Sequence, residues 1–200
     1  MMPVYFQEPN SIEKFGLVLK QVEGVMSKQL VITALGGDRA GIVDELSDVL
    51  SSHQLNINDS RMSVLGGEFA VLILVSGSSA SIDDFMSKKD SLEESLSMKL
   101  LVKPTSEKAS AEALAPYIVE VVSIDHPGIV HDIARFFSSR KINIVDLDTS
   151  RYAAAHTGTP MFALTMTVEV PADQPIAKLR DEFITVCDDL NLDASMTAKV

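Results

Sequence analysis

Apolar residues along the chain follow two alternating patterns, short β-branched runs and longer stretches with helical spacing. In the first half, the runs at 29–36, 55–65, 68–77 and 98–103 predict strands. Two amphipathic stretches between them predict helices, one over 40–53 and one after residue 80. The predicted order is strand, helix, strand, strand, helix, strand. The apolar helix positions are Ile42, Val43, Leu46, Val49 and Leu50, then Ile82, Phe85, Leu92 and Leu96.

The second half repeats this order. Runs at 117–124, 142–153, 160–170 and 193–200 predict strands. In the run from 160, Phe162, Leu164 and Met166 alternate with polar residues, which predicts a sheet with one buried face. Apolar residues at helical spacing again follow the first and third strands. They are Ile129, Val130, Ile133, Phe136 and Phe137, then Ile176, Leu179, Phe183, Val186 and Leu190.

The two halves also share a motif, GGDRAGIV at 36–43 and SIDHPGIV at 123–130. A shift of 87 positions places Asp38 on Asp125 and keeps register without a gap through Asp59 and Asp146. We therefore interpret the chain as two copies of one folding unit. We predict domains at 28–104 and 116–200, joined by a linker at 105–115. Residues 1–27 form an extension, in which Ile12, Phe15, Leu19 and Val22 have the spacing of a short helix.

The repeated element order predicts an α+β fold for each copy. Strand, helix, strand, strand, helix, strand is the split βαβ, or ferredoxin-like, arrangement. It forms a four-stranded antiparallel sheet, and right-handed crossovers place both helices on one face.

Charge and composition limit the kinds of molecule that we expect the chain to contact. The chain has 17 basic and 28 acidic residues, a net charge of −11. Proteins that grip DNA usually present a basic face, so the acidity argues against direct contact with nucleic acid. Cys187 is the single cysteine, which suits a reducing cytoplasm. No apolar run has the length of a membrane span.

The repeated Asp-x-x-Gly-Ile-Val motif supports two explanations. In the structural one, Asp38 and Asp125 cap the first helix of each copy, and Gly41 and Gly128 permit close packing. In the functional one, the helix N-terminus binds the carboxylate of a small amino acid. An aspartate (Asp38, Asp125, Asp59 or Asp146) and the amides of Asn56 and Asn143 then hold the ammonium group.

Catalysis is weakly supported, and we expect no enzyme and no cofactor. His126 and His131 lie five residues apart, a spacing unlike that of paired metal ligands on a helix. The chain contains no nucleophile elbow, no phosphate-binding Gly-Lys-Ser/Thr loop and no paired cysteine ligands. Solvated histidines and a buried thiol at Cys187 are the simpler interpretation.

The stretches LVITALGGDRAGIVDELSDVLSSHQLNINDSRM and DHPGIVHDIARFFSSRKINIVDL both resemble the first half of an ACT domain. The pair, from about Gln29 to Val200, is similar to the family of two-domain ACT repressors of the glycine cleavage system. This resemblance implies a non-catalytic regulator that binds a small amino acid, with glycine favoured. It also implies a homo-oligomer that holds a DNA-binding transcription activator rather than DNA.

The resemblance further implies a ligand site between the first strand-helix loop of one ACT domain and the second strand of another. Two alternatives remain open, a ligand-independent interaction module and a stand-alone regulatory subunit of an amino-acid metabolic enzyme. The carried-over site residues are Asp38, Arg39, Ala40, Gly41, Ile42 and Asn56 in the first copy, and Asp125, His126, Pro127, Gly128, Ile129 and Asn143 in the second.

Overall fold

The computed structural model describes residues 27–106 and 113–199, and the chain divides into two compact units, 1–108 and 109–200. The helix expected in the N-terminal extension lies outside the described residues. Strand β4 reaches Thr105 and strand β5 begins at Leu114, so both ends of the predicted linker are part of a strand.

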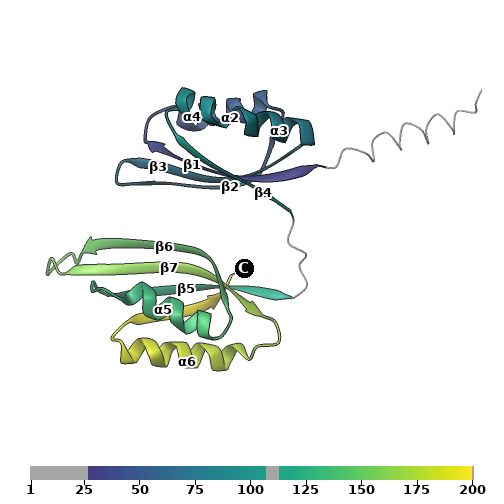
Figure 1. The fold of residues 1–200 in the computed structure, drawn as a ribbon. Coiled ribbons are helices and arrows are strands. Elements are labelled where there is room, and N and C mark those ends of the chain that lie inside the picture. The colour runs from purple at the N-terminus through teal and green to yellow at the C-terminus, as the bar shows by residue number, and fades with distance from the viewer. Residues whose placement is uncertain (1–26, 107–112, 200) are drawn as a thin grey trace, which may run out of the picture. The chain divides into compact units, whose positions relative to one another are not determined.

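The first unit has the predicted antiparallel sheet with helices on one face (Figure 1). The strand order is β2-β3-β1-β4, which places β2 and β4 at the two edges. The elements are β1 (Lys28–Gly37), α2 (Ile42–Ser52), β2 (Asn56–Leu65), β3 (Glu68–Gly77), α3 (Ser79–Ser87), α4 (Lys89–Leu96) and β4 (Lys99–Thr105).

The second unit repeats this topology, with strand order β6-β7-β5-β8 and two helices on one face (Figure 1). The predicted α+β, ferredoxin-like fold is thus confirmed in both copies. The elements are β5 (Leu114–Ile124), α5 (Ile129–Ser139), β6 (Asn143–Ala153), β7 (Pro160–Pro171), α6 (Ile176–Asp189) and β8 (Asp193–Ala198).

Each unit has its own hydrophobic core between the helices and one face of its sheet. In β1, Leu30, Ile32 and Ala34 are fully buried. The predicted alternation in β7 is confirmed, because Phe162 and Leu164 point into the core while Thr165 is exposed. Cys187 is also fully buried in the second core, and burial raises the pKa of its thiol to about 11.

The internal repeat extends to an irregularity of the sheet. The pairing of β2 with β3 shifts register between Ile57 and Asp59, and that of β6 with β7 shifts between Ile144 and Asp146. The two positions correspond under the 87-residue shift. Such bulges kink a strand locally, so the second strand of each copy bends at the same place.

The second helix of the first unit is broken, which differs from the prediction of one helix. Helices α3 and α4 meet at Lys88, the C-cap of one and the N-cap of the other. Residues 87–91 read Ser-Lys-Lys-Asp-Ser and contain no apolar side chain. Without an apolar stripe to bury, this stretch has no packing energy to hold a continuous helix on the sheet.

In both units, a side chain at the C-terminal end of the first helix contacts the helix that follows the third strand. His53 Nε2 lies 3.6 Å from Asp84 Oδ2 in the first unit. Its counterpart under the 87-residue shift, Arg140, lies 2.9 Å from Glu182 Oε2. The same connection is therefore made by a histidine in the first unit and by an arginine in the second.

The prediction that Asp38 and Asp125 cap their helices is wrong. The N-cap residues are Gly41 and Gly128, with φ of 88° and 106°, and no side chain caps either helix. These φ values lie in the left-handed region, which only glycine adopts without strain. The motif glycine is therefore required for its backbone conformation.

We predict that Gly41→Ala lowers the free energy of unfolding by about 1–2 kcal/mol, because alanine is strained at positive φ. Gly37→Ala is the matched control, since an added Cβ there meets nothing within 4 Å and φ is ordinary. Urea unfolding of both variants measures the difference. Equal stability of the two variants would contradict the assignment.

One carboxylate fastens α4 to the neighbouring strand β4. Glu93 accepts hydrogen bonds from Lys89 Nζ at 2.9 Å and from the Leu100 amide at 2.8 Å. Lys99 Nζ lies 3.4 Å from its other oxygen. The Lys89 hydrogen bond, followed by that of the Leu100 amide, lowers the pKa of Glu93 to about 2.

A depressed pKa stabilises the fold above the carboxyl's ordinary pKa of 4.5 and loses that effect as the pH falls towards about 2. We therefore expect Glu93→Gln to lower the Tm at pH 7 and to lower it progressively less as the pH falls below 4.5. Thermal unfolding followed by circular dichroism at several pH values tests this. Glu94→Gln, at the exposed neighbouring carboxylate, should leave the Tm unchanged throughout.

Candidate functional site

The two motif loops join the first strand to the first helix and are held in the same way. The amide of Asp38 donates to the carbonyl of Gly67 at 3.0 Å, and the amide of Asp125 donates to that of Pro160 at 3.0 Å. Gly67 and Pro160 each precede by two residues a buried phenylalanine, Phe69 or Phe162. Each loop therefore lies at the same end of its sheet, beside the hairpin that follows the second strand.

The helix N-termini at these loops have free backbone donors. Glu45 donates to the Gly41 carbonyl and Asp132 to the Gly128 carbonyl, each at 3.0 Å. Within the described residues, the amides of Val43 and Asp44 have no hydrogen-bond acceptor. Unpaired amides and the positive end of the helix dipole favour an anion such as a carboxylate. The loop can therefore supply the carboxylate half of an amino-acid site.

Arg39 is engaged in its own unit. Both of its terminal nitrogens pair with the Glu45 carboxylate, and Nη2 lies 3.4 Å from the Leu96 carbonyl. The shared hydrogen bonds raise the pKa of Arg39 and lower that of Glu45. Arg39 thus neutralises an acidic side chain in the first turn of α2. At the corresponding position, exposed His126 has Nδ1 3.1 Å from the Pro127 carbonyl.

The two loop aspartates differ in their neighbours. Asp125 Oδ2 lies 2.6 Å from Arg151 Nη2. In the first unit, Val64 takes the place of Arg151, because Val64 pairs with Phe69 and Arg151 with Phe162. Across the described part of the chain, Asp38 forms no ion pair. The sequence repeat revealed both aspartates but gave no signal for Arg151, because the pair depends on strand register.

Asn56 and Asn143 lie far from the loops of their own units. Asn56 pairs with Ser76, which in turn pairs with Gln29 near the start of β1. The loop follows Gly37 at the other end of β1, eight strand positions or about 26 Å away. In the second unit, Asn143 pairs with Glu169, next to Pro116, so the same separation recurs. A small amino acid cannot span this distance within one unit.

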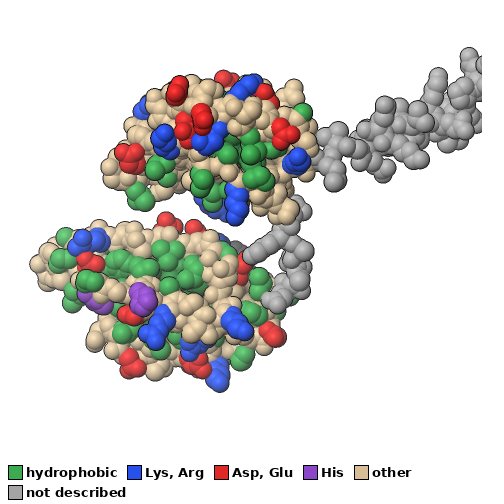
Figure 2. Space-filling model, viewed as in Figure 1, with side chains coloured by type: hydrophobic (Ala, Val, Ile, Leu, Met, Phe, Trp, Pro, Cys, Tyr) green, Lys and Arg blue, Asp and Glu red, His purple; other side chains and the backbone are tan. Residues whose placement is uncertain are grey.

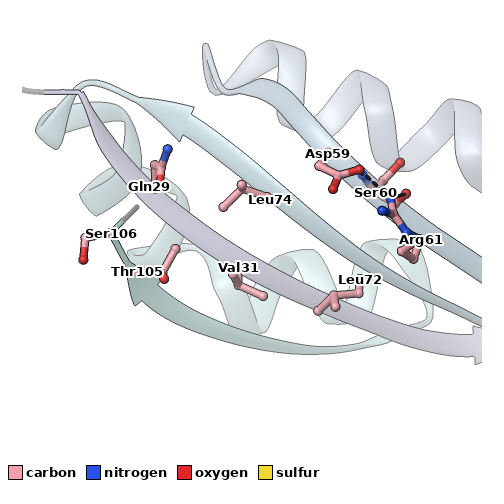
Figure 3. A pocket seen from close by; sticks show the side chains of 9 residues that line it. All are labelled: Gln29, Val31, Asp59, Ser60, Arg61, Leu72, Leu74, Thr105 and Ser106. Carbon is pink, nitrogen blue, oxygen red and sulfur yellow. Dashed lines mark hydrogen bonds and ion pairs between the residues drawn. The ribbon is translucent and has the colours of Figure 1, made fainter. Parts of the chain in front are cut away.

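The face of the first sheet opposite the helices has a hollow of about 360 Å³ (Figure 3). Val31, Leu72 and Leu74 form its apolar floor, and β2 forms one rim. On that rim, Arg61 Nη1 lies 2.6 Å from Asp59 Oδ1, so Asp59 already has a cationic partner. The alternating pattern of β1 and β3 predicts which side chains face away from the helices, but that pattern does not indicate that they form a hollow.

Neither Met62 nor Thr167 is exposed on the outer face of its sheet. Met62 pairs with buried Val71, so it points to the helix side of the sheet. Thr167 faces outward but is only 7% exposed, and Lys199 Nζ lies 3.3 Å from its hydroxyl. Thr165 is exposed, as expected.

The outer face of the second sheet carries several acidic side chains. In the second unit, cross-strand pairing places Asp146, Asp148, Glu120 and Asp193 on the face away from the helices. On the surface shown in Figure 2, basic side chains are interspersed with acidic ones. That surface therefore has no continuous basic region for a nucleic-acid backbone.

Two other kinds of site are not found among the residues that the structure describes. No three His, Cys, Asp or Glu side chains come together as a metal site would require. In the same residues, no helix is both long enough and apolar enough to cross a bilayer.

Comparison with known proteins agrees with the duplicated fold. The family model described as the ACT domain matches residues 28–110. A UPF0237 protein of Methanocaldococcus jannaschii is 35% identical over 78 residues, which make up 38% of this chain and 86% of that protein. One unit thus corresponds to nearly the whole of a smaller relative.

Relatives that align with most of this chain have both units. A solved structure from Galdieria sulphuraria, of a protein without assigned function, has 27% identity, covers 87% of this chain and 99% of its own, and has a TM-score of 0.71. Another, described as a glycine cleavage system transcriptional repressor, has 28% identity, coverage of 87% and 98%, and a TM-score of 0.66. The glycine cleavage system transcriptional repressor of Escherichia coli is 30% identical over 167 residues, which cover 84% of this chain and 88% of that protein. The chain therefore belongs to the family of tandem ACT-domain proteins that includes this repressor.

Proposed function

We propose that the chain is an amino-acid-responsive repressor of the glycine cleavage system. It binds a small amino acid, with glycine favoured, and acts in the cytoplasm through contact with a DNA-binding activator protein. The observation that carries this proposal is the 30% identity to the Escherichia coli repressor over 84% of the chain, across both ACT domains. In the described residues 27–106 and 113–199, every helix and strand belongs to one of the two ACT domains, so no segment of domain size is left there for a catalytic unit.

The loop at the start of α2 supports amino-acid binding. Free amides at the helix N-terminus suit the ligand carboxylate, and Asp38 suits its ammonium group. Gly41 has no side chain, so a small ligand can reach the backbone there. These features recognise the part of the molecule that all amino acids share.

The separation of Asn56 from its own loop supports an assembled site. Strand β2 lies at a sheet edge, so its outer backbone groups are free to pair with another strand. Two such edges running antiparallel would bring the Asn56 end of one domain to the Leu65 end of the other. The Asp38 loop lies at that same end of its sheet. A second ACT domain thus completes the socket. In our proposal that domain belongs to another copy of the chain, so the protein acts as a homo-oligomer.

Charge supports action through a protein partner. The net charge of −11 disfavours approach to DNA phosphates and favours a basic surface on the partner. A DNA-binding activator presents such a surface. Ligand and activator must then be coupled, and the coupling is reciprocal, so that each changes the affinity for the other by the same factor.

A second candidate function is a ligand-independent interaction module. The outer face of the first sheet exposes Leu72, which is 48% exposed, and Leu101, which is 71% exposed. Exposed apolar side chains on the open face of a sheet favour contact with another protein. This module would bind its partner equally well with and without an amino acid.

We expect glycine to raise the Tm of the full chain selectively over large amino acids. At 100 times its dissociation constant, a ligand stabilises the folded protein by about 2.7 kcal/mol, which corresponds to a shift of several degrees. Thermal unfolding with glycine, serine, alanine and phenylalanine at millimolar concentrations measures this. If none of them shifts the Tm, the interaction module is the better account.

We expect Asn56→Ala to weaken glycine binding at least tenfold while leaving the Tm without ligand unchanged. Asn56 is exposed, so its truncation removes no core contact. Ser60→Ala, in the middle of the same exposed strand and so away from both ends of β2, is the matched control and should bind normally. Isothermal titration calorimetry tests both variants. Normal binding by Asn56→Ala would exclude Asn56 from the socket.

A further inference from the structure

The two copies differ at the carboxylate of the motif aspartate. In the second unit, the guanidinium of Arg151 lies 2.6 Å from Asp125, whose side chain is only 20% exposed. In the first unit, Asp38 occupies the equivalent place at the end of β1, and no described cation contacts it. The same motif is therefore already neutralised in one copy and unneutralised in the other.

Strand register shows that this difference comes from one substitution. Val64 pairs with Phe69, which pairs with Gly36. Arg151 pairs with Phe162, which pairs with Ser123. Gly36 and Ser123 correspond under the 87-residue shift, as do Val64 and Arg151. Arginine thus stands in the second copy where valine stands in the first.

We infer that Arg151 is an internal counter-ion that neutralises Asp125 and prevents ligand binding in the second copy. Only the first copy then binds the amino acid. This inference rests on the proposed function and identifies which copy performs it. Arg151 is already paired with the Asp125 carboxylate, which the ammonium group of a ligand would need. Because it is attached to the same sheet, its effective concentration at Asp125 exceeds that of a free ligand at millimolar levels. The ligand would have to displace it.

Two other charged residues considered for the socket in the first copy, Arg39 and Asp59, already have partners. Arg39 lies next to Asp38 in the chain but is held by Glu45 and the Leu96 carbonyl. Asp59, on the second strand, is paired with Arg61. In the described part of the first unit, each of these charges has a partner, and the carboxylate of Asp38 has none.

Single substitutions at Val64 and Arg151, made in the full chain, test the inference. Isothermal titration calorimetry with glycine, serine and alanine should show one site per chain in the wild type. Arg151→Val should raise this to two sites, the second with an affinity within about tenfold of the first. Val64→Arg should abolish binding, because the new guanidinium pairs with Asp38. Val64→Thr, which keeps the branched shape, should bind as the wild type does.

Other outcomes would contradict the inference. Two sites in the wild type, or normal binding by Val64→Arg, would overturn the inference while leaving the proposed function intact. Loss of binding in Arg151→Val would also overturn it, and would make Arg151 a residue that holds the ligand carboxylate. If neither the wild type nor Arg151→Val binds any of the three amino acids, both the proposed function and this inference fail.

Discussion

Burial of one face of each four-stranded sheet beneath its helices is the constraint on which the rest of the structure depends. Alternating residues such as Leu30 and Ile32 must face the helices, which fixes the register of every strand. Register in turn decides which end of the sheet each polar residue occupies. It places the Asp38 loop and Asn56 about 26 Å apart, and it places Arg151 beside Asp125. The chemistry of the loops therefore follows from packing elsewhere in the unit.

Much of this fold could be predicted from the sequence, because the apolar pattern repeats twice and each copy supports the other. The strands and the first helices are where periodicity predicts them. The break at Lys88 was missed because the apolar residues on either side of it still keep helical spacing across the polar segment. Local pattern gives the elements but does not show whether a helix continues through a stretch that buries nothing.

The candidate site was less accessible to prediction. The motif indicated the loop residues, but residue type alone suggested a capping aspartate, whereas the glycine itself occupies the N-cap. Arg151 and Glu45 act through pairs formed across a loop or a strand, and such pairs depend on side-chain reach as much as on position in the sequence. Duplication helps here, because a residue that differs between two matching frameworks identifies where their chemistry has diverged.

The buried cysteine gives the duplicated chain an asymmetry of a different kind. Cys187 is the only thiol, and it lies in the core of the second unit, where its raised pKa keeps it protonated. An alkylating reagent can react with it only when that core opens. Opening of the first unit alone leaves no chemical trace. The rate of thiol labelling therefore follows the motions of the second half of the protein alone.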